Sequence, residues 1–192
     1  IPMTNSLYAT SFSLKTLDHL GINLYGNAPA VIAELVANAH DAGARRVDIT
    51  ISPGRIVVQD DGFGMSLNDI NTKYLRFGYE KRREVTNIIV SDGERTVQRH
   101  LMGRKGIGKR SALSIARDVE VQTARDGERN GFVLDLGVIA HLQEQNSTEY
   151  LPRALPTDSI GIEQGTRIEM RHLVDGVTGL NDTLRETLAR MF

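Results

Sequence analysis

Three polar residues lie at helical spacing inside an otherwise apolar stretch, AVIAELVANAHDA, from position 30 to position 42. A helix would place Glu34, Asn38 and Asp41 within one narrow sector of its surface, at about 100° per residue. Two carboxylates and an amide on that sector could activate a water molecule or bind a metal ion. The alternative is a solvated stripe on an amphipathic helix, but the other residues are mostly apolar and leave no separate buried face. The stretch therefore predicts a helix that carries part of a functional site.

A second candidate group, DDGFGM at positions 60 to 65, directly follows a predicted strand. Asp60 would stand where a sheet opens to loops, a common location for ligand-binding groups. Its carboxylate could accept a hydrogen bond from an exocyclic amine, and Gly62 and Gly64 would let a flat ring approach the backbone. One alternative is an ordinary Asp-Gly turn. A calcium loop is excluded, because its acids must alternate before the glycine.

A third group, GRKGIGK at positions 103 to 109, holds three glycines and three basic residues before a predicted short helix. Backbone N–H groups at a helix start favour anions, and the added positive charge suits a polyphosphate. The spacing also matches a P-loop, but Arg110 occupies the place of the magnesium-binding hydroxyl, and the preceding residues form a poor strand. A flexible loop before an ordinary helix remains the other alternative.

The helices and strands that must position these groups can be predicted from hydrophobic periodicity and from the residues that typically start or end such elements. Pro29 suits the first turn of the site helix and Gly43 its end. Alternating apolar residues predict a hairpin over 47–58 and a second hairpin over 119–136, and Ser66 with Asp69 predicts a helix over 67–75. Hairpins that alternate with helices favour a two-layer α/β sandwich with a mixed sheet. The other expected elements are helices over 14–20, 112–116 and near the end of the chain, a weakly structured lid over 77–102, a loop over 144–160 and a strand from 165.

The composition narrows the class of function. The chain has 192 residues, 40% of them hydrophobic, and a formal net charge of -1, which gives no basic field that would attract nucleic acid or membrane. Without cysteine there are neither disulfides nor thiolate metal sites. The five histidines show no metal-ligand spacing, and no apolar run is long enough to span a membrane. We expect a cytoplasmic protein without a membrane partner.

In this order, the motifs resemble the GHKL ATPase superfamily, the Bergerat-fold group of gyrase B subunits, ninety-kilodalton heat-shock chaperones, histidine kinases, MutL proteins and MORC ATPases. The resemblance covers about residues 14 to 175. It rests on Glu34-x-x-x-Asn38-x-x-Asp41-Ala42, Asp60-x-Gly62-x-Gly64, Gly103-x-x-Gly106-x-Gly108 and Gly165-Thr166. It implies an α+β fold whose mostly antiparallel sheet carries helices on one face and an ATP lid. It also implies binding of ATP and Mg²⁺.

The resemblance implies a role for each matching residue. Glu34 would be the general base that activates the attacking water, and Asn38 would bind Mg²⁺. Asp60 would accept a hydrogen bond from the adenine amine, with Thr166 assisting through its hydroxyl and a water. Asp41 would belong to the nucleotide pocket without a defined role. The other predicted nucleotide contacts are Gly62, Gly64 and Met65 beside the adenine, and Gly103, Arg104, Lys105, Gly106, Ile107, Gly108 and Lys109 at the phosphates.

Within the superfamily, the motifs most resemble MORC-like and related bacterial ATPases. The resemblance implies a single ATPase domain over 29–192, preceded by an extension over 1–28 that is exchanged when ATP drives dimerisation. The chain is expected to be part of a longer protein, with partner domains and with DNA among its candidate partners. The alternative functions are a histidine-kinase-type catalytic domain and a nucleotide-sensing module without hydrolysis.

Overall fold

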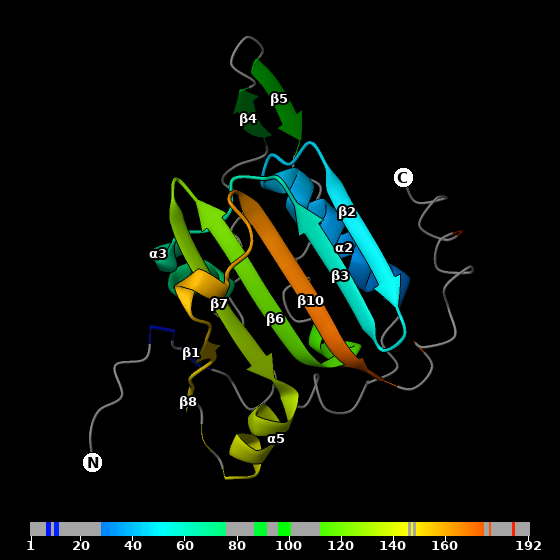
Figure 1. Cartoon of the computed structure of the whole chain (residues 1–192), viewed down its shortest axis with the longest axis vertical. Helices are drawn as coiled ribbons and strands as arrows, with labels where there is room; N and C mark the ends of the chain where they lie inside the picture. The colour runs from blue at the N-terminus through cyan, green and yellow to red at the C-terminus, as the bar shows by residue number, and fades with distance from the viewer. Residues whose placement is uncertain are drawn as a thin grey trace.

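The computed structural model describes residues 7, 8, 10–11, 28–75, 87–91, 96–100, 112–145, 147, 149–174, 177 and 186. Its main feature is a six-stranded sheet in the order β2-β3-β10-β6-β7-β9, and each described pair of neighbouring strands is antiparallel (Figure 1). The strands are β2 Val47–Ser52, β3 Arg55–Asp60, β10 Gly165–Leu173, β6 Ala116–Arg125, β7 Glu128–Asp135 and β9 Arg153–Ala154.

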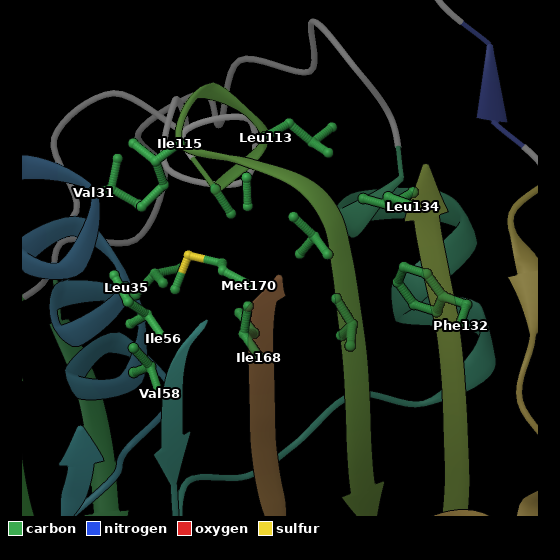
Figure 2. Packing of buried hydrophobic residues seen from close by; sticks show 14 of the residues in the cluster. Val31, Leu35, Ile56, Val58, Leu113, Ile115, Phe132, Leu134, Ile168 and Met170 are labelled. Carbon is green, nitrogen blue, oxygen red and sulfur yellow. The ribbon is translucent and has the colours of Figure 1, made fainter. Parts of the chain in front are cut away.

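One helix, α2 Ala28–Asp41, covers the sheet from behind in the view of Figure 1. Its buried side chains Val31 and Leu35 face Ile56 of β3 and Met170 of β10 across the main core (Figure 2). These positions of α2 recur at helical spacing, and burying each large apolar side chain contributes about 1.5–3 kcal/mol. The expected α+β class and two-layer sandwich are confirmed, and Gly43 ends the helix with a φ of 78°.

The strand β10 has two different faces because successive side chains of a strand point to opposite sides. Ile168 and Met170 belong to the core, on the side of α2. Arg167, Glu169 and Arg171 alternate with them and therefore lie on the opposite side. The sheet thus has an apolar face under α2 and a charged face away from it.

The hairpin of β6 and β7 closes through Asp126 and Gly127, whose φ values are 52° and 82°. Two successive positive φ values are typical of a type I′ turn, the turn that best matches the twist of paired strands. The helix α5 Leu136–Glu144 follows β7 without a gap, and its Ile139 reaches the core. The predicted second hairpin is confirmed, although Leu136 belongs to α5 and not to the strand.

The described N-terminal residues pack against the same chain. Tyr8 is only 2% exposed, and its ring centroid lies 5.0 Å from that of Phe132. Its hydroxyl accepts a hydrogen bond from the Gly131 backbone N–H at 3.1 Å. The short strand β1 Thr10–Ser11 pairs with β8 Glu149–Tyr150.

The helix predicted over 67–75 is replaced by two shorter elements. The capping box of Ser66 and Asp69 is present and starts α3 Leu67–Asp69, but a π-helix, Ile70–Tyr74, continues it. Both Ile70 and Leu75 are buried, and the Leu75 N–H donates to the Ile70 carbonyl oxygen at 2.8 Å. In an α-helix, two side chains five residues apart would point in directions that differ by about 140°. The wider π-helical turn, hydrogen-bonded over five residues, brings Ile70 and Leu75 to the same side of the helix.

Three further predictions differ from the structure. The expected lid contains an antiparallel hairpin, β4 Asn87–Ser91 with β5 Thr96–His100, because β-branched residues flank Asp92-Gly93 on both sides. The expected helix over 112–116 is a single 3₁₀ turn, Ala112–Ser114, and Ala116 already belongs to β6. The expected loop over 144–160 contains β8, β9 and a 3₁₀ turn, Thr157–Ser159.

Other predictions lie outside the described residues. These are the helix over 14–20, the segment 103–109 and most of the terminal helix, of which Glu186 is described as helical. Among the residues that are described, no helix is both long and apolar enough to cross a membrane.

Candidate functional site

Three polar side chains lie in one row at the end of the sheet. The strand register pairs Asp60 of β3 with Thr166 of β10, and Thr166 in turn with Thr123 of β6. Residues paired across antiparallel strands point to the same face of a sheet. The hydroxyl oxygens of Thr123 and Thr166 are 3.3 Å apart, and both side chains are buried. The row therefore presents a carboxylate and two hydroxyls together.

Asp60 is a mostly buried carboxylate with an unusual pKa. Burial raises its pKa from 3.8 to about 6, because removal of water disfavours the charged form. The backbone N–H groups of Gly62 and Thr166 act in the opposite direction, and the Gly62 N–H donates to Asp60 Oδ1 at 2.9 Å. A carboxylate held at a strand end in this way can accept a hydrogen bond from a ligand.

The neighbouring Asp61 has a structural role. Its Oδ1 accepts the backbone N–H of Arg45 at 2.7 Å and that of Arg46 at 2.9 Å. Burial raises its pKa, but these hydrogen bonds outweigh that effect and hold the pKa below its usual range. Asp61 thus fastens the loop after β3 to the segment before β2, whereas the Asp60 side chain accepts a backbone N–H within its own loop.

Two glycines allow the backbones to meet beside Asp60. At Gly64, whose φ is 67°, a Cβ atom would lie 2.1 Å from the carbonyl oxygen of Ala124. At Gly165, whose φ is 90°, a Cβ atom would lie 2.0 Å from the carbonyl oxygen of Asp60. Real Cβ atoms do not approach oxygen so closely, and L-residues disfavour these angles. Only glycine therefore fits at either position.

Side chains of β6 and of the residue just before β10 hold the loop of residues 60–65 in place. The Met65 backbone N–H donates to Thr123 Oγ1 at 2.8 Å, and Gln164 Nε2 donates to the Gly62 carbonyl oxygen at 2.9 Å. Neither Thr123 nor Gln164 was predicted as a site residue. Their signal in the sequence is weak, because a polar residue near a strand end is common. Gly62 and Met65 both lie in this loop, as predicted.

The same loop also contacts the end of α2. The Phe63 N–H donates to the Ala42 carbonyl oxygen at 2.8 Å. At Gly62, a Cβ atom would lie 2.8 Å from that oxygen, so a glycine is needed for this contact too. Ala42 directly follows Asp41, the last residue of α2. The structure therefore brings the carboxyl-terminal end of the site helix to the loop that begins at Asp60.

By their helical spacing, Glu34, Asn38 and Asp41 fall beside the buried positions of α2, and each is half-buried when the whole residue is counted. The Oε1 atom of Glu34 is buried and has no hydrogen-bond partner among the described residues. A buried carboxylate oxygen is normally hydrogen-bonded, because leaving it without a partner costs about 1–3 kcal/mol or more. The Asp41 side chain is only 7% exposed, and its Oδ1 lies 3.6 Å from His40 Nδ1.

The arrangement predicts that Gly64 cannot be replaced. We expect Gly64→Ala to lower the free energy of unfolding by about 4 kcal/mol or more, because the new methyl group would collide with the Ala124 carbonyl oxygen. Gly127→Ala is the matched control. Its φ is 82°, but nothing lies within 4 Å of the added atom, so we expect a loss of only about 1–2 kcal/mol. Equal losses in urea denaturation would contradict the close approach.

Comparison with known proteins gives the family of the chain. Residues 27–166 match the family model described as "Histidine kinase-, DNA gyrase B-, and HSP90-like ATPase". The chain is 42% identical over 190 residues to a Herpetosiphon aurantiacus protein named "Putative type II restriction enzyme HgiDII", covering 99% of this chain and 30% of that protein.

Two DNA mismatch repair proteins MutL are also similar. The protein from Phocaeicola vulgatus is 36% identical over 56% of this chain and 16% of its own length. The protein from Bradyrhizobium diazoefficiens is 31% identical over 75% of this chain and 21% of its own length. The chain thus spans less than a third of these relatives. The match over most of its length shows that the chain belongs to the GHKL family of histidine kinase-, DNA gyrase B- and HSP90-like ATPases.

Proposed function

We propose that this chain binds ATP with Mg²⁺ and hydrolyses it, with Glu34 as the general base that activates the attacking water. The buried Oε1 of Glu34, without a partner among the described residues, carries this proposal. A water molecule in front of that oxygen would supply the missing hydrogen bond and would itself be polarised towards attack.

The adenine ring is proposed to lie at the row of Asp60, Thr166 and Thr123. The Asp60 carboxylate would accept the hydrogen bond of the exocyclic amine, and Thr166 would assist through its hydroxyl and a water. Asp60 is mostly buried and Thr166 is buried, so a hydrogen bond here would face little competition from solvent. The backbone of Gly62 and Gly64 and the half-buried Met65 would line the ring.

Asn38 is proposed to hold Mg²⁺ through its amide oxygen. The described residues contain no cluster of three or more acidic or histidine side chains that could hold a metal ion alone. Mg²⁺ suits such a site because it takes few protein ligands and keeps water and phosphate oxygens in its shell. When bound, the ion would supply positive charge against the phosphate oxygens. Asp41 is assigned to the same pocket without a defined role.

The phosphates are proposed to contact the segment Gly103, Arg104, Lys105, Gly106, Ile107, Gly108 and Lys109, which lies outside the described residues. Its glycines and basic side chains are the supporting observation. A closer relation to MORC-like ATPases also stays a prediction, as do the cytoplasmic location and the separate extension over 1–28.

For the whole protein, we propose that ATP drives a change of conformation and dimerisation. The chain spans only 30% of the restriction-enzyme relative, so further domains could respond to the nucleotide. One relative is named a putative type II restriction enzyme and others are named DNA mismatch repair proteins, and these names support DNA as the target of the longer protein. Tyr8 and β1 pack within one chain here, and an exchanged N-terminus would form the same contacts between two chains.

The role of Glu34 can be tested by Glu34→Gln. We expect this variant to bind ATP but to hydrolyse it about 100-fold or more slowly, because the amide cannot accept the proton of water. Phosphate release and nucleotide affinity are measured separately. Glu144→Gln is the control, because this side chain is 79% exposed on α5. Full hydrolysis by Glu34→Gln would contradict the base, and ATP binding without phosphate release by the unmodified protein would favour a sensing module.

Asp60→Asn should weaken ATP binding but stabilise the free protein above pH 6. We expect affinity to fall about 10- to 100-fold, because an amide nitrogen replaces one acceptor oxygen. Because the pKa of Asp60 is higher in the folded protein, protonated Asp60 stabilises the fold relative to the charged form. This stabilisation is fully present below pH 3.8 and is lost as the pH rises through about 6. Asparagine avoids that loss, so the gain should reach up to about 3 kcal/mol at pH 8 and vanish near pH 4. Affinity is followed by calorimetry and stability by urea denaturation.

Asp61→Asn is the matched control for this pair of effects. Its pKa is lowered in the folded protein, so the charged form stabilises the fold above pH 3.8. We expect Asp61→Asn to lower stability at neutral pH, opposite in sign to Asp60→Asn. The same sign for both substitutions would contradict the different environments of the two carboxylates.

Dimerisation can be tested by light scattering with a non-hydrolysable ATP analogue. We expect the mass of the particle to double when the analogue and Mg²⁺ are added together, and to stay that of a monomer with either alone. Asp60→Asn serves as the control, and it should need about 10- to 100-fold more analogue for the same response. A monomer under all conditions would contradict dimerisation of this chain and would leave the hydrolysis proposal untouched.

A further inference from the structure

The charged face of the sheet, opposite α2, carries an open pocket of about 340 Å³. Three arginines and two glutamates from neighbouring strands line it, and Figure 1 shows no described helix in front of β3 and β10 on this side. The arginines are Arg55, Arg167 and Arg171, and the glutamates are Glu120 and Glu169. The nucleotide site proposed above lies on the other face, so this pocket needs a separate explanation.

Every carboxylate oxygen of the pocket already accepts at least one hydrogen bond. Glu169 is 4% exposed, and Arg55, Arg167 and Arg171 all donate to it. Glu120 Oε2 accepts from Arg171 at 2.6 Å, and its Oε1 accepts from Gln122 at 2.7 Å. Burial raises the pKa of Glu169, but the three arginines outweigh that effect and hold it at about 2. Glu169 therefore has little capacity left for a further donor, and both oxygens of Glu120 are already engaged by neighbouring side chains.

The arginines Arg55 and Arg171, in contrast, have N–H groups beyond those that contact the two glutamates. Arg55 uses its Nε and Nη2 atoms on Glu169, and Arg171 uses its Nε and Nη2 atoms on the two glutamates. A guanidinium has more N–H groups than these contacts use, because Nη1 carries donors of its own. The side chains of Arg55 and Arg171 are 47% and 41% exposed, so a ligand can reach them. The pocket also has an excess of one positive charge.

We propose that this pocket binds an acidic side chain, aspartate or glutamate, of a polypeptide segment outside this chain. A carboxylate supplies the two features that the pocket lacks, acceptor oxygens and a negative charge, and its shape matches two parallel guanidinium N–H groups. A polyanion such as nucleic acid fits less well, because Glu120 and Glu169 stand among the arginines and the formal net charge of the chain is -1.

The size of the pocket and the length of the relatives support a polypeptide as the occupant. A volume of about 340 Å³ is enough for one or two side chains and too small for a duplex. The chain spans 30% of its restriction-enzyme relative, so polypeptide beyond this domain exists in such proteins. The pocket would then join the ATPase domain to a neighbouring segment through charge-assisted hydrogen bonds.

The test is a nuclear magnetic resonance titration of the chain at low salt with the peptide acetyl-Gly-Glu-Gly-Glu-Gly-amide. The resonances observed are the arginine Nε–H groups and the backbone amide of Gly161, which lines the pocket and donates to Gln122. We expect them to shift and saturate by about 10 mM, because a single ionic contact is weak. The same peptide with glutamine in place of glutamate should cause no shift.

Arg171→Gln and Arg55→Gln should each weaken the peptide about three- to fivefold, as expected for removal of one partly exposed charge contact. Arg46→Gln is the matched control, because Arg46 also pairs with an acid, Asp48, but lies outside the pocket. An unchanged amide spectrum away from the pocket shows that each variant is folded. The readout involves no nucleotide, so it succeeds or fails independently of the proposed ATPase activity.

Four outcomes would overturn the proposal. These are no shift at the arginines, equal weakening by Arg46→Gln, acetate binding as tightly as the peptide, and a short oligothymidylate binding at these arginines more tightly than the peptide. The first would make the pocket a purely structural ion-pair network. The last two would assign it to small carboxylates or to nucleic acid.

Discussion

The close contact of three strand ends beside Asp60 is the constraint on which the rest of the site depends. Gly64 lies against the Ala124 carbonyl, and Gly165 lies against the Asp60 carbonyl, so neither position has room for a side chain. This contact places Thr166 and Thr123 in line with Asp60. It also directs the loop of residues 60–65 back to Ala42 at the end of α2. The parts of the site are therefore joined through backbone geometry, which is less tolerant of change than contacts between flexible side chains.

Most of this architecture could be predicted from the sequence where a hydrophobic period coincides with residues that typically begin and end a helix or strand. The site helix has a clear apolar period, a proline in its first turn and a glycine after its end, and α2 matches it within two residues. Asp60, Gly62 and Gly64 were predicted as a group because they are close in sequence. Their common loop then places them together whatever the rest of the fold does.

Other features depend on contacts that no local pattern reveals. Thr123 and Thr166 are brought together by the register of β6 and β10, between residues far apart in the chain. The helix α5 was missed because it follows β7 directly, and its Leu136 extends the apolar pattern of that strand. Its own signal was Asp135, whose carboxylate accepts the Val138 N–H at 3.1 Å in the manner of a helix cap. The π-helix after α3 reflects the need to bury both Ile70 and Leu75, which is a tertiary demand.

The two adjacent carboxylates at the end of β3, Asp60 and Asp61, have opposite pKa shifts. As the pH falls, Asp60 takes up its proton near pH 6, whereas Asp61 keeps its charge to below pH 3.8. Between these values the N–H groups of Arg45 and Arg46 still hold the loop through Asp61, while the neighbouring acceptor is neutral. Mild acid would therefore neutralise Asp60 while Asp61 still holds the loop. Two carboxylates that are neighbours in the chain would therefore lose their charges as two separate events on the acid side.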